Sequence, residues 1–290
     1  MVIFFMAFLV GLGWVFGEVM DPGFGYGGML AAFAIAMAMA LFSYFSGGSA
    51  VLMMSGAKEI KHEDNPDLYH IVENLCIGAG IKKVPTIYII DDTAPNAFAT
   101  GRDPDHAVVA VTSGLLSKLE KAELEGVIAH ELSHIKNYDM LIMTMVVILV
   151  GVVTLLSDFM LRYFWWGGGG KRDKNEGGGQ LQLIMMIVAI ALAILSPLIA
   201  TLIKLAISRK REFLADADAV LITRYPEGLA RALEKLTADR EPLEVANKAT
   251  AHLYIVNPLT EHKGSSIGWF ASLFNTHPPI EDRVAKLRAM

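Results

Sequence analysis

Four long uncharged stretches divide the chain, and shorter segments with helical or alternating periodicity lie between them. The uncharged stretches are Met1–Gly17, Met29–Phe45, Met140–Ser157 and Leu183–Ile203. Because about 20 apolar residues in a helix cross the hydrocarbon core of a bilayer, each stretch predicts a transmembrane helix. No basic residue precedes the first stretch, so it is predicted to be a retained helix rather than a cleaved signal peptide.

The overall composition agrees with a membrane protein. Hydrophobic residues make up 53% of the chain and charged residues only 19%, which is too apolar for an ordinary soluble domain. The formal net charge of -5 gives no reason to expect nucleic acid as a partner. The single cysteine, Cys76, excludes an internal disulfide framework and is predicted to be a buried thiol.

Between the second and third stretches the pattern indicates a small module of helices and strands. Residues 67–80 have the apolar spacing of a helix, and residues 86–90 and 107–111 are rich in β-forming residues. Residues 96–101 are predicted to be extended, and residues 52–55 are predicted to form a further short strand. A small mixed sheet packed beside helices is the economical arrangement.

A metal-binding motif lies in the helical run before the third stretch. His130 and His134 are four residues apart, so on a helix both imidazoles project from one face and can share a metal ion. Glu131, next to the first histidine, is then placed to act as a general base toward an attacking water. The alternative is a pair of packing or surface histidines on an amphipathic helix, and a third ligand decides between the two.

The third ligand is expected after the fourth stretch. Glu212 lies there, with Asp216 one turn later on the same helical face, where it can accept a hydrogen bond from a ligand histidine. The alternative is that Glu212 pairs only with Arg209 or Lys210. Because two consecutive transmembrane helices return the chain to its starting side, the segment that contains His134 and the segment that contains Glu212 are expected to meet at the bilayer surface.

Basic residues next to the apolar stretches predict the orientation. Those on the side of the module are Lys58, Lys61, Lys136, Arg209, Lys210 and Arg211. This side is therefore predicted to be cytosolic. The predicted parts are residues 1–48 with two transmembrane helices, 49–139 with the first part of a cytosolic domain, 140–207 with a transmembrane hairpin and its glycine-rich link, and 208–290 with the second part of that domain.

Four motifs in this order resemble the HtpX-type membrane zinc metalloproteases and, more distantly, the CAAX prenyl endopeptidases. They are Asn96-Ala97-Phe98-Ala99-Thr100-Gly101, His130-Glu131-Leu132-Ser133-His134, Arg211-Glu212-Phe213-Leu214-Ala215-Asp216 and Thr276-His277-Pro278-Pro279. The resemblance covers essentially the whole chain, including the four apolar stretches. The expected fold class is mainly α (α+β), with four transmembrane helices and a zincin-like metalloprotease domain that contains a small β-sheet.

The resemblance also implies roles for individual residues. His130, His134 and Glu212 would bind one Zn²⁺ per chain, and Glu131 would be the general base. The segment Asn96–Gly101 would be an edge strand that holds the substrate backbone by β-addition, and its alternative is an ordinary loop.

Three further residues have roles that stay open. His277 would stabilise the oxyanion near the scissile carbonyl, or it caps the helix that begins at Ile280. Arg283 would support that corner, or it pairs with Glu281 or Asp282. Asp139 is expected to orient a neighbour or cap a helix rather than to catalyse. The remaining histidines are scattered and none is predicted to be a ligand: His62, His70, His106, His252 and His262.

The expected function is that of a multi-pass membrane-bound zinc metalloendopeptidase. Its active site would face the cytoplasm and cleave membrane or misfolded proteins in quality control and the stress response, so the expected partners are protein or peptide substrates and the lipid bilayer. Two alternatives are kept. A non-enzymatic scaffold with a structural metal would need a fourth protein ligand, for which His277 is the candidate. A prenyl-protein endopeptidase would need an intramembrane chamber larger than four helices enclose.

Overall fold

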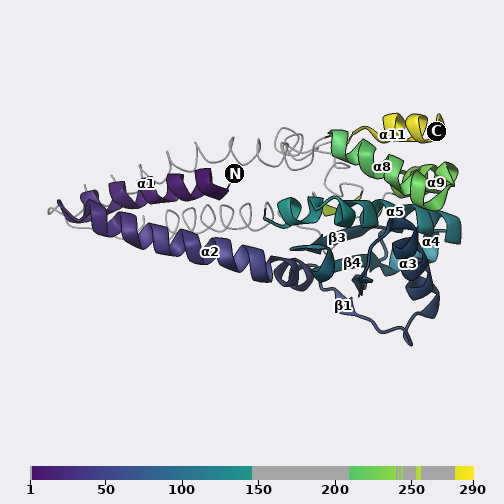
Figure 1. The fold of residues 1–290 in the computed structure, drawn as a ribbon, viewed down its shortest axis with the longest axis horizontal. Helices are drawn as coiled ribbons and strands as arrows, with labels where there is room; N and C mark the ends of the chain where they lie inside the picture. The colour runs from purple at the N-terminus through teal and green to yellow at the C-terminus, as the bar shows by residue number, and fades with distance from the viewer. Residues whose placement is uncertain (1, 146–208, 240, 242, 244–252, 256–277) are drawn as a thin grey trace, which may run out of the picture. The chain divides into compact units, whose positions relative to one another are not determined.

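The computed structural model describes residues 2–145, 209–239, 241, 243, 253–255 and 278–290 of the 290-residue chain (Figure 1). These residues belong to two compact units. Residues 2–45 lie in the first unit, and the described residues from 46 onward lie in the second. Most of the third predicted transmembrane stretch, the whole of the fourth, and His277 lie outside the described residues.

Two helices correspond to the first two predicted transmembrane stretches. Helix α1 (Val2–Met20) covers the first stretch, and α2 (Gly25–Met54) covers the second. The best 18-residue window of α2 has a mean hydropathy of 1.9. Within the described ranges, α2 is the one helix that is long and apolar enough to cross a membrane by length and composition. The arrangement with four transmembrane helices therefore stays a prediction.

A short turn and a close helix crossing shape the first unit. Glu18 closes the turn between α1 and α2, because its two carboxylate oxygens accept the backbone N–H groups of Gly23 and Gly25, each at 3.1 Å. The helices approach closely at Gly13 and Gly28, where an added Cβ would collide with the backbone of the facing helix. Small residues at such a crossing are typical of helices that pack in a membrane.

The strand predicted at residues 52–55 is wrong. These residues form the last turn of α2 and the turn that follows it. The amide of Ser55 donates to the carbonyl of Val51 at 3.0 Å, which is the hydrogen bond of a continuing α-helix. Gly56 then ends the helix with a φ of 61°, a left-handed conformation that glycine adopts without strain. A short apolar run fits helix and strand equally well, and here the preceding helix decides.

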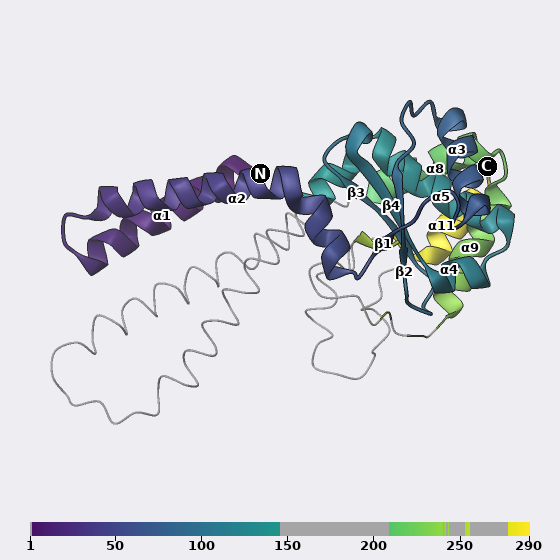
Figure 2. The same ribbon diagram turned by 90° about the horizontal axis from the view of Figure 1, so that it is seen from below.

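A four-stranded mixed sheet forms one layer of the second unit (Figure 2). Its strands are β1 (Lys58–Glu59), β2 (Thr86–Ile90), β3 (Ala97–Gly101) and β4 (Ala107–Thr112), in the order β1-β2-β4-β3. β2 and β4 run parallel, and the other two pairs are antiparallel. The predicted small mixed sheet is confirmed, and β3 lies at its edge.

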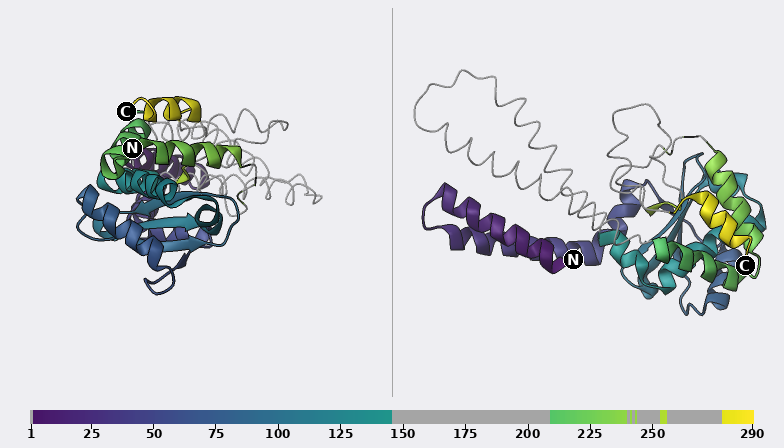
Figure 3. Two further views of the ribbon diagram at one scale, coloured as in Figure 1. Left: turned by 90° about the vertical axis from the view of Figure 1, so that its right-hand side faces the viewer. Right: turned by 90° about the horizontal axis from the view of Figure 1, so that it is seen from above.

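Helices cover one face of this sheet in successive layers. They are α3 (Pro66–Ala79), α4 (Ser113–Lys118), α5 (Lys121–Lys136), α8 (Arg209–Thr223), α9 (Pro226–Ala238) and α11 (Ile280–Leu287). α5 lies between the sheet and the pair α8 and α9, and α11 packs on the far side of that pair (Figures 1 and 3). The helix with the H-E-x-x-H motif is therefore the centre of the second unit.

Glycines set how closely α5 and α9 cross. A Cβ added to Gly126 would lie 2.7 Å from the backbone nitrogen of Leu229, and one added to Gly228 would lie 2.5 Å from the carbonyl of Ala122. Beside this crossing, Lys235 on α9 donates to the buried carboxylate of Glu123 on α5 at 2.7 Å. These contacts fix the rotation of α5, and with it the direction in which its two histidines point.

Candidate metal centre

The three polar residues of the motif on α5 all point into the protein interior. His130, Glu131 and His134 expose 1%, 3% and 4% of their surface. Polar side chains this deeply buried need partners, because burial removes their hydrogen bonds to water. The alternative in which the two histidines lie on a protein surface is therefore excluded.

Helix α8 brings a carboxylate to the same place. Glu212, Ala215, Asp216 and Ala219 form a buried stripe with the spacing of one helical face, and α8 packs directly on α5. Glu212 is fully buried and faces both histidines. The structure thus brings Glu212 next to His134 across 78 positions of sequence. The hairpin predicted between them lies outside the described residues and stays a prediction.

The three side chains place three donor atoms at the spacing of zinc ligands. Nε2 of His130 and Nε2 of His134 are 3.3 Å apart. Oε2 of Glu212 lies 3.8 Å from Nε2 of His130, and Oε1 of Glu212 lies 3.6 Å from Nε2 of His134. Atoms at two corners of a zinc tetrahedron, each about 2.0–2.1 Å from the metal, are about 3.3–3.4 Å apart. The donor set and its geometry therefore fit a zinc ion.

Two further carboxylates hold the outer nitrogens of the two imidazoles. Nδ1 of His130 lies 3.0 Å from Oδ1 of Asp216, and Nδ1 of His134 lies 3.2 Å from Oδ2 of Asp139. With the proton on Nδ1, each ring donates to its carboxylate and turns the lone pair of Nε2 toward the shared position. Arg211 in turn donates to Oδ1 of Asp139 at 2.9 Å.

Arg283 completes this support from α11. Its Nε donates to Oδ2 of Asp216 at 2.9 Å and its Nη2 donates to Oδ1 at 2.6 Å, which is a two-pronged contact inside the core. Burial alone would raise the pKa of Asp216, but the charge of Arg283 and the hydrogen bonds from His130 and Arg283 lower it to about 2. Among the described residues Arg283 thus pairs with Asp216, and not with Glu281 or Asp282.

Electrostatics place a proton in the metal-free cluster. Burial opposes a charge on His134, but the hydrogen bond to Asp139 and the carboxylates of Glu212 and Glu131 raise its pKa to about 9. A metal ion must displace that proton to bind, because a ligand imidazole has to be neutral. Burial also raises the pKa of Glu131, which makes its carboxylate a stronger base than one in water.

The edge strand β3 reaches this cluster through its backbone. The N–H of Ala99 donates a hydrogen bond to the carboxylate of Glu131. Two residues earlier the carbonyl of Ala97 accepts the N–H of Ile255 at 3.2 Å. These groups face away from β4, which pairs with the other side of the strand. The predicted extended segment is therefore a strand next to the cluster and not an ordinary loop.

A second group of ligand-type side chains was not predicted from the sequence. His62, His70 and Glu73 have ligand atoms within 4.8 Å of one another, at the surface of the second unit. The spacing of His70 and Glu73, three residues apart in a predicted helix, is the one signal that points to it. His62 comes from outside that helix, so its approach depends on a turn that the pattern of apolar residues does not reveal.

Comparisons with known proteins identify the family of this chain. Residues 62–290 match the family described as peptidase family M48. A protein named "Protease HtpX homolog" from Dictyoglomus thermophilum is 48% identical over 263 residues, which is 91% of this chain and 82% of that protein. One of the same name from Pyrococcus furiosus is 46% identical over 288 residues, or 98% of this chain and 92% of that protein.

The fold also resembles a solved structure. The crystal structure of S. mikatae Ste24p matches with a TM-score of 0.53 at 18% identity. The match covers 95% of this chain but 62% of the Ste24p chain. Since the family match covers more than half of the chain, and HtpX homologues are similar over nearly all of it, the resemblance to HtpX-type proteases is confirmed. The chain belongs to peptidase family M48.

Proposed function

We propose that this peptidase is a zinc-dependent endopeptidase whose centre is the buried cluster on α5 and α8. The observation that carries the proposal is the convergence of Nε2 of His130, Nε2 of His134 and the carboxylate of Glu212 at ligand spacing in the interior. Three protein ligands leave one tetrahedral position for water or substrate, which is the arrangement of a catalytic rather than a structural zinc site.

Each surrounding residue has a defined task in this proposal. His130, His134 and Glu212 hold one zinc ion per chain, which when bound supplies a Lewis acid that polarises the scissile carbonyl and activates water. Asp216 orients the ring of His130, and Arg283 holds Asp216 in place. These contacts fix the proton on Nδ1, so that Nε2 is free to act as a ligand.

Glu131 is proposed as the general base. It is adjacent in sequence to His130, and its carboxylate is buried within the cluster. The raised pKa that burial causes suits proton transfer at neutral pH, because a base works best when its pKa lies near the working pH. Glu131 would take a proton from the attacking water and pass it to the leaving amine of the cleaved peptide bond.

The segment Asn96–Gly101 is proposed to bind the substrate backbone by β-addition. Its strand β3 ends the sheet, and the outward groups of Ala97 and Ala99 lie within two residues of each other on that edge. A backbone N–H already pairs with the Ala97 carbonyl, donated by Ile255 of the same chain. A substrate strand would pair with the same carbonyl. It would then also lie next to Ala99, whose N–H contacts the carboxylate of Glu131.

His277 is proposed to stabilise the oxyanion that forms at the attacked carbonyl. It lies outside the described residues, and the support is its place in the Thr276-His277-Pro278-Pro279 motif, three residues before α11. Since Arg283 on α11 contacts Asp216 in the cluster, the start of this helix is tied to the site. A donor in this position would act on charge that develops only during the reaction.

The protein is further proposed to be a multi-pass protein of the cell membrane with its active site in the cytoplasm. The support is the long apolar helix α2 together with the predicted third and fourth stretches. The two proposed parts of the peptidase domain, residues 49–139 and 208–290, meet where α5 packs on α8. A centre at the bilayer surface, as the sequence predicts, would suit membrane or misfolded proteins as substrates, in quality control and the stress response.

The test is cleavage of an unfolded protein such as casein by full-length, detergent-purified protein. We expect Glu131→Gln to lower the cleavage rate by at least about 100-fold, because general base catalysis contributes about 10²–10⁴-fold. Glu125→Gln on the same helix, which removes a half-buried carboxylate away from the cluster, is the matched control and should cleave at the wild-type rate. Zinc content should be equal in all three proteins.

Two outcomes would contradict the proposal. If Glu131→Gln cleaves casein as fast as the wild type, Glu131 is not the base. If the wild type binds zinc stoichiometrically and cleaves neither casein nor a set of membrane-protein substrates, the metal is structural and the chain acts as a scaffold.

A further inference from the structure

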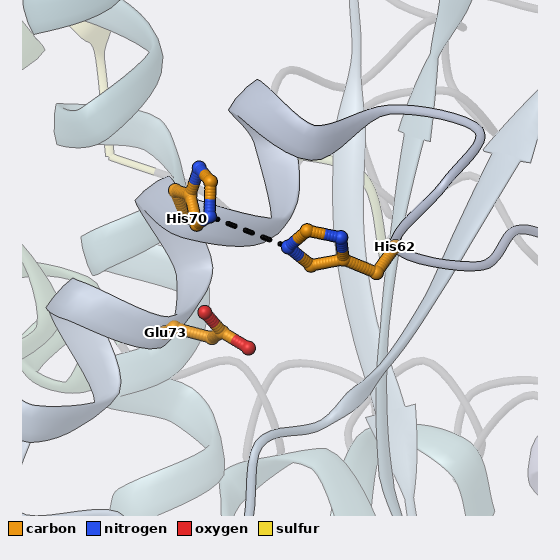
Figure 4. A group of neighbouring side chains, drawn as sticks. All are labelled: His62, His70 and Glu73. Carbon is orange, nitrogen blue, oxygen red and sulfur yellow. Dashed lines mark hydrogen bonds between the residues drawn. The ribbon is translucent and has the colours of Figure 1, made fainter.

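A second, exposed set of metal-ligand side chains lies on the surface of the peptidase unit. Nε2 of His62 and Nε2 of His70 are 3.3 Å apart, and their ring centroids are 5.0 Å apart. Glu73 lies one helical turn beyond His70, and the ligand atoms of all three are within 4.8 Å of one another. Figure 4 shows the two imidazoles facing each other, with the Glu73 side chain beside them.

The chain holds His62 in this position through a stable turn. Asp64 accepts the backbone N–H of Lys61 at 2.7 Å, which closes the turn that contains His62. The hydroxyl of Tyr69 on α3 donates to the carbonyl of Ile60 at 2.5 Å, which ties the start of the turn to the helix. The ring of His62 also packs against that of Tyr69, with centroids 5.5 Å apart.

The partners on the helix are also fixed. Asn65 caps α3 by accepting the N–H of Leu68 at 3.1 Å, and Pro66 occupies the first helical position, where it suits the helix. His70 and Glu73 are three residues apart on one face, so their side chains are neighbours. A metal ion would therefore meet ligands that the fold has largely placed before binding.

The local charge is favourable for a cation. The carboxylate of Asp64 belongs to the turn that contains His62, and that of Glu73 lies one helical turn from His70 on α3. These negative charges attract a divalent ion. In the metal-free protein one imidazole can donate its Nε2 proton to the other, and a bound ion would take the place of that proton.

We propose that His62, His70 and Glu73 bind a divalent late transition-metal ion, with zinc as the probe. Two imidazoles and one carboxylate suit Zn²⁺, Ni²⁺ or Cu²⁺, whereas Mg²⁺ and Ca²⁺ prefer sites made of oxygen atoms only. Glu73 would supply its carboxylate as the third protein ligand after rotation of its side chain, and water would supply the remaining ligand. The ion would link α3 to the turn that precedes it. α3 is a helix that packs against α5.

The experiment measures zinc binding by the full-length protein in detergent, with any histidine tag removed. The protein is stripped with a chelator and titrated with ZnCl₂ in a calorimeter. We expect the wild type to bind a second zinc ion more weakly than the first. His62→Gln and His70→Gln should each weaken the second event by at least about 10-fold, since ligand loss exceeds the effect of losing a supporting contact. The first event should be unchanged.

A matched control and a second readout make the result decisive. His106→Gln removes another exposed histidine, one that contacts Asp103 and Arg102, and should leave both events as in the wild type. Amide hydrogen exchange of residues 60–65 should slow when the second zinc binds, in the wild type but not in His70→Gln. A single zinc event in the wild type, a second event that both ligand variants retain, or equal competition by MgCl₂ would each overturn the proposal.

Discussion

The two histidine pairs of the peptidase unit, His130 with His134 and His62 with His70, have the same distance between their Nε2 atoms but different surroundings. Their Nε2 atoms are 3.3 Å apart in both the buried pair and the exposed pair, and the ring centroids are 4.8 Å and 5.0 Å apart. The buried pair adds the carboxylate of Glu212, and the exposed pair adds that of Glu73. The distance between the ligand nitrogens alone therefore does not distinguish a catalytic metal centre from a site that only binds a metal.

What separates them is burial and support for the outer nitrogens. In the buried pair, Asp216 and Asp139 hold the two Nδ1 atoms, and Arg283 holds Asp216. Charges in such a water-poor interior interact more strongly than at the surface. Glu131 also lies in the buried cluster, with its pKa raised by burial. The exposed pair also has its ligand atoms close together, but it lies at the solvent-exposed surface. This favours binding of a metal without catalysis.

The largest expected contrast is between the two ligand carboxylates. Glu212→Gln should lower the zinc affinity of the first binding event by at least about 100-fold and abolish casein cleavage at stoichiometric zinc, because a neutral amide replaces a charged ligand. Glu73→Gln should leave cleavage within about twofold of the wild type and weaken only the second event. Cleavage and calorimetric titration of both variants measure this. Equal losses of activity in Glu212→Gln and Glu73→Gln would show that the two carboxylates do not differ in their role.

A smaller effect is expected from removing a carboxylate that holds a ligand ring. Asp139→Ala should weaken the first zinc event about 10–100-fold, since His134 loses the acceptor for its Nδ1 proton. Asp103→Ala is the control, because it removes a similar contact of 2.7 Å to the exposed His106. Zinc affinity from competition with a chromogenic chelator reads this out. An unchanged affinity in Asp139→Ala would mean that the ring needs no such support.

The smallest effect is expected from removing both exposed histidines. The double variant His62→Gln/His70→Gln should cleave casein within about twofold of the wild-type rate at one equivalent of zinc. Surface substitutions of this kind change stability little, and α3 keeps its cap at Asn65. Initial rates across a range of casein concentrations measure this. A loss of activity comparable to that of Glu212→Gln would show that the exposed cluster is part of the catalytic machinery.

The sequence predicts the buried site better than the exposed one for a physical reason. The fixed spacing of a helix predicts that His130 and His134 share one face, and the hairpin predicted from the third and fourth apolar stretches predicts that Glu212 returns to them. His62 and His70 meet across a turn whose geometry depends on the contact between Tyr69 and the Ile60 carbonyl. No periodicity encodes such a contact.

Other differences between the predictions from the sequence and the structure also arise where contacts or neighbouring elements, rather than local pattern, decide the outcome. The sequence leaves the role of Arg283 open, because its partner Asp216 lies 67 residues away on another helix. The strand predicted at residues 52–55 failed because a short apolar run does not reveal that the helix before it continues to Met54. By contrast, the strands at residues 86–90 and 107–111 were predicted from local composition alone and are confirmed.

The most direct test of the whole account is the rate of casein cleavage by metal-free wild-type protein as zinc is added back. If the buried cluster is the catalytic centre and the exposed cluster only binds a metal, the rate of casein cleavage should rise linearly and reach its maximum at one zinc ion per chain. Filling the weaker second site should then add nothing. A rate that stays at zero until the second ion binds, or that does not respond to zinc, would contradict the account.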